Sequence, residues 1–351
     1  MGMKLSSRHL SLVAIFFLLA LIVVISVLSS EDRKKVHLGG QVLSDEANEN
    51  IPLSEISGSY LFHDKQDNKD YVYTIGDASS EIAISGIDLK KKEIISTTFL
   101  DIKEKILNKF GVCHSKHVKS CRDIEKLLTT QWEGIYVDPK KKIFLLNEAL
   151  ATILVYDQEV KDITQIINLN RFTIEEINKD ALSDLDENSL AEGFLPLNNG
   201  HILVLKENFP PSLVEFGFLG EEPEGFNESL LIDENKPFPV SYDHFSLEPL
   251  SVWLLPSSMN HCDLSELAYS KEGGLNILSQ KCQIILELKE LTTQKKTLEF
   301  KNFYRFSPEI TEAEAFILLP GRGEFLIFED KKNLGDKNIH FFSSKKQGKN
   351  P

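Results

Sequence analysis

The sequence predicts an all-β fold, and three observations support that prediction. Five hairpin-like segments recur along the chain, at 53–77, 132–148, 191–216, 263–288 and 312–330. Each segment has a polar entry, an apolar run, a turn, a second apolar run and a polar exit, a pattern that is typical of paired strands. The equivalent positions Ser54, Glu133, Glu192, Ser265 and Glu314 are 79, 59, 73 and 49 residues apart. Strand-only units with such spacing predict a β-propeller rather than a helical solenoid.

The segment at 191–216 shows the repeating unit most clearly. Its apolar runs Gly193–Leu197 and His201–Leu205 flank the sequence Asn-Asn-Gly, which readily adopts the positive φ angles of a tight turn. A third run, Ser212–Phe216, alternates apolar with polar residues, so three strands and a missing or degenerate fourth would make one blade. The long intervals leave room for another blade, for which 221–244 is a candidate as a diverged blade or an insertion. We therefore expect five or six blades, with six slightly favoured.

The N-terminal segment at 1–30 predicts one transmembrane helix that acts as a signal anchor. Lys4 and Arg8 precede Leu10–Leu28, which only two serines interrupt, and about 20 apolar residues span a bilayer. No A-x-A-like cleavage site stands out, and a cleaved signal peptide is the alternative. The anchor places the chain in the inner or cell membrane as a single-pass protein, with its bulk on the extracytoplasmic side.

The remaining boundaries and the charge complete the predicted organisation. Residues 31–52 are polar and predict a tether, 53–343 predict the propeller, and 344–351 predict a disordered tail. The chain carries a net charge of −14, so its surface repels phosphates, and nucleic acid is excluded as a partner. The expected partners are the membrane, through the N-terminal helix, and an unknown small molecule or protein at the propeller face.

Four cysteines predict two local disulfides. Cys113 and Cys121 enclose a short stretch with two histidines, which would suggest zinc in a cytosolic protein. The spacing fits no standard structural zinc framework, and thiols pair in exported segments, so a Cys113–Cys121 disulfide is favoured over zinc. Cys262 precedes the first strand of its hairpin and Cys282 follows the second. Antiparallel pairing brings these two positions to one end, which predicts a Cys262–Cys282 disulfide.

Short motifs at the strand entries and exits carry a resemblance to known propellers. The entries read E-G followed by Ile or Phe, or LSEL, and the exits read GD, NE, KE and ED. Over about residues 51–343 they resemble the SdiA-regulated family of membrane-anchored bacterial propellers, and the related phytase-like esterases and gluconolactonase-type propellers. The resemblance implies a five- or six-bladed propeller and no settled activity. Calcium use belongs to the phytase-like and gluconolactonase relatives, and their metal residues do not match this chain position by position.

Acidic residues recur where the first strand of a hairpin begins and where its second strand ends. Reflection of each hairpin about its turn brings entry and exit to one end of the blade. The predicted opposing pairs are Glu133 with Asn147, Glu192 with Lys206, and Glu314 with Glu329. Pro196 within a first strand indicates an edge strand, as expected next to the propeller axis. One mouth should then collect the carboxylates of Asp77, Glu133, Glu148, Glu192, Glu207, Glu314 and Asp330.

Crowded carboxylates repel one another, which raises their pKa values, and a hard cation such as Ca²⁺ relieves the repulsion. One hypothesis is therefore a calcium site at Glu133, Glu192 and Glu314. The alternatives are that these acids cap strand ends or pair with Lys206 and Arg322, or that two of them form a catalytic pair. The sequence contains no nucleophile elbow, phosphate-binding glycine loop or HExxH helix.

Two functions stay open at this point. The first is a membrane-tethered, non-catalytic propeller that binds a ligand or acts as a scaffold outside the cytoplasm. The second is a calcium-dependent hydrolase of phosphoesters or lactones at the acidic mouth. A phosphoester site normally includes Lys or Arg, and here only Lys206 and Lys281 are candidates, which favours binding. The histidines His201, His261 and His340 lie near strand ends without a nucleophile partner and are expected to be structural.

Overall fold

The computed structural model describes residues 41–111, 119–170, 191–207, 210–271, 273–320 and 323–344. The predicted transmembrane helix at 1–30 lies outside these ranges, as does nearly all of the predicted tail. None of the helices within the described ranges is long and apolar enough to cross a membrane. The contacts between Cα atoms group residues 39–351 into one compact unit.

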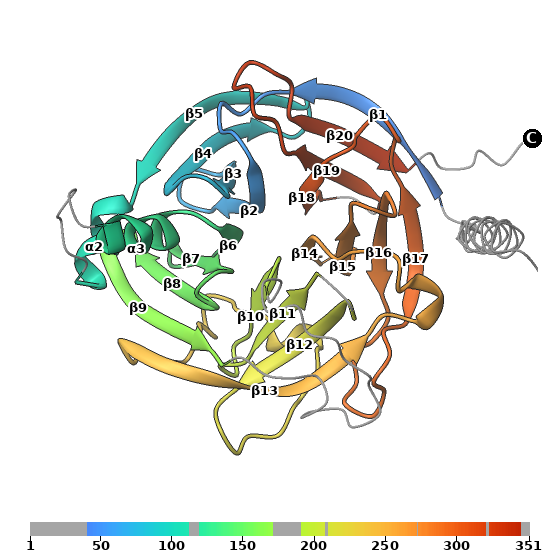
Figure 1. Cartoon of the computed structure of the whole chain (residues 1–351). Coiled ribbons are helices and arrows are strands. Elements are labelled where there is room, and N and C mark those ends of the chain that lie inside the picture. Colours follow the sequence, from blue (N-terminus) through green and yellow to red (C-terminus); the bar gives the residue numbers. More distant parts are fainter. Residues whose placement is uncertain are drawn as a thin grey trace, which may run out of the picture. The chain divides into compact units, whose positions relative to one another are not determined.

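Within the described ranges, twenty strands form five four-stranded antiparallel blades around a common centre (Figure 1). Parallel pairing between outer strands joins four of these blades, two by two, into eight-stranded sheets. Blade 1 contains β2 (Ile56–Asp64), β3 (Lys69–Gly76), β4 (Glu81–Asp88) and β5 (Glu93–Asp101). Blade 2 contains β6 (Trp132–Val137), β7 (Lys142–Asn147), β8 (Thr152–Asp157) and β9 (Asp162–Leu169). Blade 3 contains β10 (Phe194–Pro196), β11 (Ile202–Lys206), β12 (Ser212–Gly217) and β13 (His244–Leu254).

The last two blades follow the same plan, with one exception in their order. Blade 4 contains β14 (Glu266–Ser270), β15 (Gly274–Ser279), β16 (Ile284–Leu288) and β17 (Phe300–Arg305). Blade 5 contains β18 (Ala313–Leu318), β19 (Glu324–Glu329), β20 (Ile339–Ser344) and, as its outer strand, β1 (Gln41–Glu49). The all-β propeller prediction is confirmed. Among the described residues the blades number five, so the preference for six was wrong.

The segment between β12 and β13 shows why the sequence suggested a sixth blade. Residues 218–243 form an irregular insertion with one short 3₁₀ helix, Glu228–Leu230, and the chain then continues into β13. The fourth strand of blade 3 is therefore present, but it is displaced along the sequence by this insertion. Of the two interpretations of this segment, the insertion is confirmed.

The strand β1 corrects the predicted tether. It pairs antiparallel with β20, with Leu43 opposite Ser344 and Glu49 opposite Ile339. Thus the second half of the segment that read as a polar linker is part of the propeller, which begins at residue 41 rather than 53. The pairing joins the N-terminal and C-terminal strands in one blade and closes the ring.

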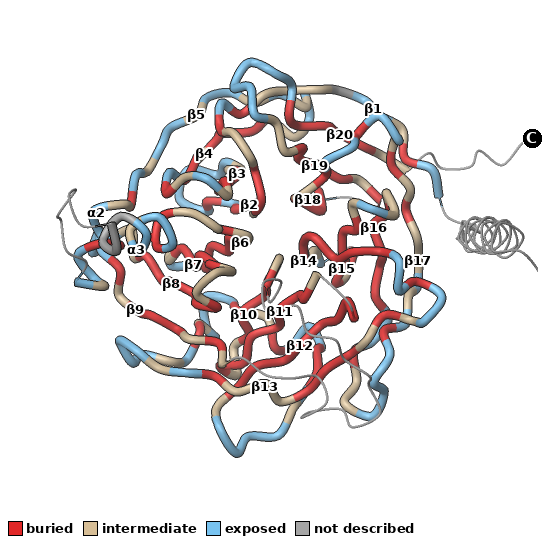
Figure 2. Tube along the Cα trace, in the orientation of Figure 1, coloured by how far each residue is buried: buried red, intermediate tan, exposed pale blue. Residues whose placement is uncertain are grey.

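The first strand of every blade occupies the edge nearest the centre (Figure 1). This placement agrees with Pro196 in β10, because proline has no N–H to donate and an inner edge strand needs none on its free side. The blades pack against one another through apolar faces, and Figure 2 shows buried residues along β6–β8, β10–β12 and β14–β16. The outer strand β5 is largely exposed.

Two helices, α2 (Lys103–Lys109) and α3 (Lys119–Thr129), lie on the outside of the ring between β5 and β9 (Figure 1). Ile106 and Leu128 from these helices are buried in the same apolar cluster as Trp132 of β6. The helices therefore extend the core between blades 1 and 2 without taking part in the sheets.

Glycines allow the inner strands β2 and β6 to approach closely. A Cβ atom on Gly58 would lie 2.8 Å from the Cα atom of Gly134, and a Cβ atom on Gly134 would lie 2.9 Å from the Phe194 ring. Both distances are too short for carbon atoms in contact, and at Gly58 the neighbour is backbone that has no rotamer to change. Gly134 belongs to the E-G motif, whereas Gly58 follows Ser57, so a glycine at this place in each strand allows the close approach.

We expect Gly58→Ala to destabilise the propeller by about 1–3 kcal/mol, because the added methyl group forces β2 and β6 apart. Urea unfolding followed by circular dichroism measures this difference. Gly335→Ala is the matched control, since a Cβ atom at Gly335 has no neighbour within 4 Å. Equal unfolding midpoints for Gly58→Ala and the wild type would contradict the close-approach explanation.

Candidate functional site

One end of the central channel opens into a cavity of about 390 Å³, which we call the acidic mouth. It is lined by Glu55, Ile56, Ser57, Asp77, Glu133, Glu192, Glu207, Glu314, Asp330 and Lys332. Six of the seven carboxylates that the sequence placed at one mouth therefore line a single cavity. Glu148 does not line the cavity, but its charge acts on both Glu133 and Glu192.

Bulges in the inner strands position two of these carboxylates. Trp132 pairs with Asn147 and Gly134 with Leu146, which leaves Glu133 as the extra residue of a β-bulge. In blade 5, Ala313 pairs with Glu329 and Ala315 with Phe328, so Glu314 occupies the same place. Bulges of this kind redirect a side chain. The predicted pairs Glu133 with Asn147 and Glu314 with Glu329 were thus wrong by one residue.

Blade 1 has the same bulge, but with a hydroxyl side chain. Ile56 pairs with Gly76 and Gly58 with Ile75, so Ser57 is the extra residue. The equivalent position proposed from the sequence, Ser54, was three residues too early. Blade 1 thus contributes a serine to the mouth where blades 2 and 5 contribute a glutamate.

Glu192 enters blade 3 just before β10. Its backbone N–H donates to the carbonyl oxygen of Leu205 at 3.1 Å, and the N–H of Leu205 donates to the carbonyl of Gly193 at 2.7 Å. The next pair, Phe194 with Val204, has the register that reflection about the Asn-Asn-Gly turn predicted. The predicted register is therefore confirmed from Phe194 to Pro196. At the entry, Glu192 and Gly193 both hydrogen-bond to Leu205, so the predicted pair of Glu192 with Lys206 is not confirmed.

Burial and mutual repulsion control the ionisation of the mouth. Burial, followed by the charges of Asp77 and Glu148, raises the pKa of Glu133 well above its usual value. Burial and the charge of Glu133 do the same to the pKa of Glu192. Burial, with Asp263 and Glu207 as neighbours, raises the pKa of Glu314 to about 7. At pH 7 the carboxyl group of Glu314 is therefore protonated in part unless positive charge is supplied.

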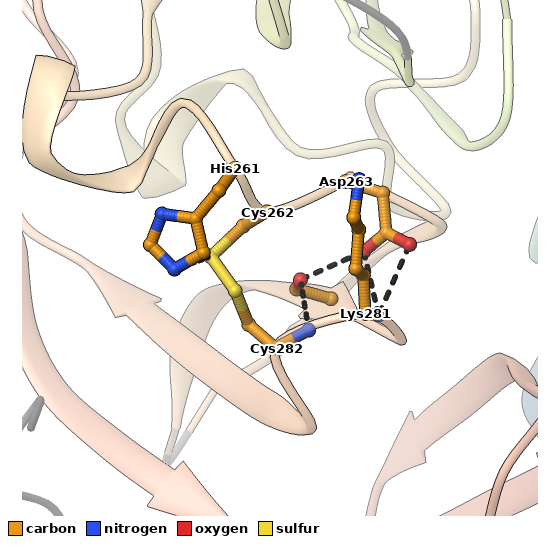
Figure 3. Close-up of a disulfide and its surroundings, with 6 residues drawn as sticks. His261, Cys262, Asp263, Lys281 and Cys282 are labelled. Carbon is orange, nitrogen blue, oxygen red and sulfur yellow. Dashed lines mark hydrogen bonds between the residues drawn. A yellow bond between two sulfur atoms is a disulfide. The ribbon is translucent and has the colours of Figure 1, made fainter. Parts of the chain in front are cut away.

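Blade 4 places a buried carboxylate near Glu314, namely Asp263, which was not predicted from the sequence. Its Oδ1 atom accepts hydrogen bonds from Ser279 Oγ at 2.8 Å and from the backbone N–H of Lys281 at 3.0 Å (Figure 3). The neighbouring Cys262 forms a disulfide with Cys282, with their Cα atoms 5.3 Å apart. The disulfide ties both ends of the hairpin together and so fixes the position of Asp263 near Glu314.

The Cys262–Cys282 prediction is confirmed. His261 lies close to this pair (Figure 3), but the two sulfur atoms are bonded to each other and do not form a metal site with it. Cys113 lies outside the described residues, as does the side chain of Cys121. The Cys113–Cys121 disulfide and its zinc alternative therefore stay predictions.

The mouth contains a cation that was not predicted from the sequence. Lys332, just after the exit of β19, lines the cavity. Lys206 is only 1 % exposed and is not among the lining residues, and Arg322 lies outside the described residues. A search for basic residues two positions beyond each acidic exit would have found Lys332, which follows Asp330 in this way.

Two of the three histidines have structural partners, as expected. His201 is buried, and its Nδ1 atom lies 2.7 Å from Glu215 Oε1. His340 Nε2 lies 2.8 Å from Glu329 Oε2. Neither contact involves a residue that lines the acidic mouth.

The donor set of the mouth fits a hard cation. Its charged groups are carboxylates apart from Lys332, and oxygen ligands are those that calcium takes. One carboxylate atom, Asp330 Oδ1, is buried and has no hydrogen-bond partner among the described residues. A buried carboxylate oxygen without a donor is costly, and a cation bound next to it would remove that cost.

Comparisons with known proteins do not identify the family or the function of this chain. No family model and no curated protein matches the chain. Among solved structures, the WD40 repeats of RRP9 are 8% identical, with 87% of this chain and 98% of that chain covered and a TM-score of 0.44. The luciferin-regenerating enzyme is 13% identical, with 86% and 94% covered and a TM-score of 0.38. The Pseudomonas aeruginosa periplasmic gluconolactonase PpgL is 12% identical, with 82% and 69% covered and a TM-score of 0.36. Such distant likenesses say nothing about function, and the fold rests on the strand pairing given above.

The raised pKa values predict how stability depends on pH without divalent cations. A carboxyl group whose pKa is higher in the folded state stabilises that state at low pH, and this contribution is lost as pH rises through the raised pKa. For Glu314 the loss extends from its usual value of 4.5 to about 7. We expect the melting temperature in excess chelator to fall between pH 5 and pH 8, and Glu314→Gln to reduce the fall.

The control is Glu93→Gln, which removes an exposed carboxylate of the outer strand β5. It should leave the pH dependence of the melting temperature as in the wild type. If Glu314→Gln and the wild type show the same pH dependence of the melting temperature, the pKa of Glu314 is not raised in the folded state.

Proposed function

We propose that this chain is a membrane-tethered, extracytoplasmic binding module, and that its acidic mouth holds a calcium ion as part of the ligand site. The observation that carries the proposal is the convergence of carboxylates from blades 1, 2, 3 and 5 on one cavity. The tether rests on the apolar segment at 1–30 in the sequence. The ligand at the propeller face is a small molecule or a segment of a partner protein.

The proposed cation ligands are Glu133, Glu192 and Glu314, which enter the mouth from three different blades. Their raised pKa values mean that each carboxylate ionises at a cost in the folded protein. A bound divalent cation stabilises the ionised forms and offsets the repulsion between them. Calcium suits the site better than magnesium, because it accepts irregular sets of 6–8 oxygen ligands.

The cavity supports a role in binding beyond the cation itself. Its volume of about 390 Å³ exceeds what an ion and its ligands fill, so a second group has room beside the cation. A carboxylate or another oxyanion of the ligand would meet the cation on one side and Lys332 on the other. The Cys262–Cys282 disulfide supports the placement of the propeller in an oxidising compartment.

A calcium-dependent hydrolase of phosphoesters or lactones is the second candidate. Glu314 favours it, because a carboxyl group with a pKa of about 7 is suited to general acid–base catalysis near neutral pH. The number of basic residues argues against the hydrolase. Only one lysine is among the described residues that line the mouth, whereas phosphoester sites hold their anion with several Lys or Arg side chains. The resemblance of the sequence motifs to the SdiA-regulated family implies no activity that would decide between the two.

We expect calcium to raise the melting temperature of the full chain, because a cation that binds only the folded state stabilises it. When the free calcium concentration is 100 times its Kd, the free energy of unfolding rises by about 2.7 kcal/mol. The double variant Glu192→Gln and Glu314→Gln should abolish the rise, and magnesium should produce a smaller one. The matched control Glu81→Gln and Glu93→Gln removes two exposed carboxylates and should retain the full effect.

An unchanged wild-type melting temperature in millimolar calcium would contradict the cation site. Turnover of p-nitrophenyl phosphate and of a simple lactone by the same samples distinguishes the two functions. Calcium-dependent turnover that Glu314→Gln removes would establish the hydrolase. Calcium binding without turnover would leave the binding module as the function.

A further inference from the structure

A second cavity opens at the other end of the same inner strands. It has a volume of about 310 Å³, and we call it the apolar pocket. The acidic mouth is lined by residues at the entries of these strands, such as Ser57 and Glu133, whereas the apolar pocket is lined by residues further along them, such as Tyr60 and Tyr136. The two cavities therefore occupy opposite ends of the channel.

Glu266 lies between the two cavities. This side chain of β14 is 2 % exposed and replaces the small residue found at the equivalent position of the other blades. Its Oε1 atom accepts a hydrogen bond from the N–H of Leu267 at 3.1 Å, and its Oε2 atom accepts one from the N–H of Ser59 at 3.2 Å. Glu266 thus links β14 to β2 through the N–H groups of two residues that line the apolar pocket.

The chemistry of the apolar pocket is opposite to that of the acidic mouth. Among the described residues that line it, none carries a formal charge. Phe194, Phe316 and the tilted pair Tyr60 and Tyr136, with ring centroids 4.7 Å apart, supply aromatic surface. A charged ligand would lose its hydration here without gaining a partner, so the pocket selects uncharged molecules.

One polar group of the pocket lacks a partner. Ser59 is 6 % exposed, and its hydroxyl oxygen has no hydrogen-bond partner among the described residues. Such a buried hydroxyl costs free energy unless a partner is supplied, and a serine hydroxyl can turn to donate or accept. Ser59 is therefore the group that a bound molecule would satisfy.

The insertion at 218–243 completes the rim of the pocket. Leu231 and Ile232 line the pocket, and Asn198 Nδ2 donates to the carbonyl oxygens of Ser229 and Leu231, each at 2.7 Å. The N–H of Asn198 donates to the carbonyl of Leu230 at 2.7 Å. The rim is therefore built by specific hydrogen bonds between the turn of blade 3 and the insertion, and not by a loosely placed loop.

We propose that the apolar pocket is a second binding site, which takes a small uncharged aromatic molecule with a hydroxyl group that pairs with Ser59. The volume is at the lower end of the range of about 300–1,000 Å³ found for small-molecule pockets, which fits a compact fused-ring ligand. The site needs no cation, and its occupancy is independent of the function proposed for the acidic mouth.

The experiment uses 2-naphthol and naphthalene as probes, with the full chain and excess chelator in the same buffer for every variant. Equilibrium dialysis should show saturable binding of 2-naphthol, tighter than that of naphthalene. Ser59→Ala should weaken 2-naphthol binding about 3- to 10-fold, the worth of one hydrogen bond, and leave naphthalene binding unchanged. Ala268→Leu, which fills the pocket, should abolish the binding of both probes.

Ser212→Ala is the matched control. Ser212 has an equally buried hydroxyl without a hydrogen-bond partner among the described residues, but it does not line the pocket, so its variant should bind both probes as the wild type does. Circular dichroism melting checks that each variant is folded. The proposal is overturned if the wild type shows no saturable binding, or if Ser59→Ala and Ser212→Ala affect 2-naphthol equally. Because chelator is present throughout, failure of the calcium proposal does not change either outcome.

Discussion

Closure of the ring of blades determines where the side chains of both cavities meet. The strand β1 completes blade 5 with chain from the other end of the sequence, and Asn338 secures the joint. Its side chain is buried, accepts a hydrogen bond from the N–H of Ile51 at 2.9 Å and donates to the carbonyl of Ile51 at 2.8 Å. His340 adds a contact of 2.8 Å to Asn48. Without this joint the blades would not surround a channel, and neither cavity would have a complete wall.

Closure also explains the chemistry of the acidic mouth. A single hairpin with one glutamate at its entry would leave that carboxylate in water, with an ordinary pKa. The ring places Glu133, Glu192 and Glu314 around one axis, where burial and mutual repulsion raise their pKa values. Further along the same strands, aromatic and aliphatic residues line a cavity without charged side chains among the described residues. The fold thus yields two cavities of opposite character from one set of inner strands.

The sequence predicted what depends on local pattern. Turn residues such as Asn198 and Gly200, and alternation of apolar residues, were sufficient for the hairpins and for the convergence of acidic entries and exits. It did not predict β1, because Gln41–Glu49 is polar and an outer strand needs little apolar surface once it has a partner, here nearly 300 residues away. It also did not predict the bulges at Glu133 and Glu314, which depend on how inner strands meet at the axis. Asp263 was missed because its role arises from its proximity to Glu314 of the neighbouring blade, whereas Lys332 could have been found from its place two residues after Asp330.

Proton release on calcium binding measures whether the ring holds the carboxylates so close together that they cannot all stay ionised without a cation. The full chain is titrated with calcium in weakly buffered solution at pH 6.5, and the released protons are counted by back-titration. Carboxyl groups with raised pKa values must lose their protons to bind the ion, so we expect release of about one proton or more per calcium bound. Calcium binding without release of protons would contradict this expectation, because the carboxylates would then already be ionised and not crowded in the way described.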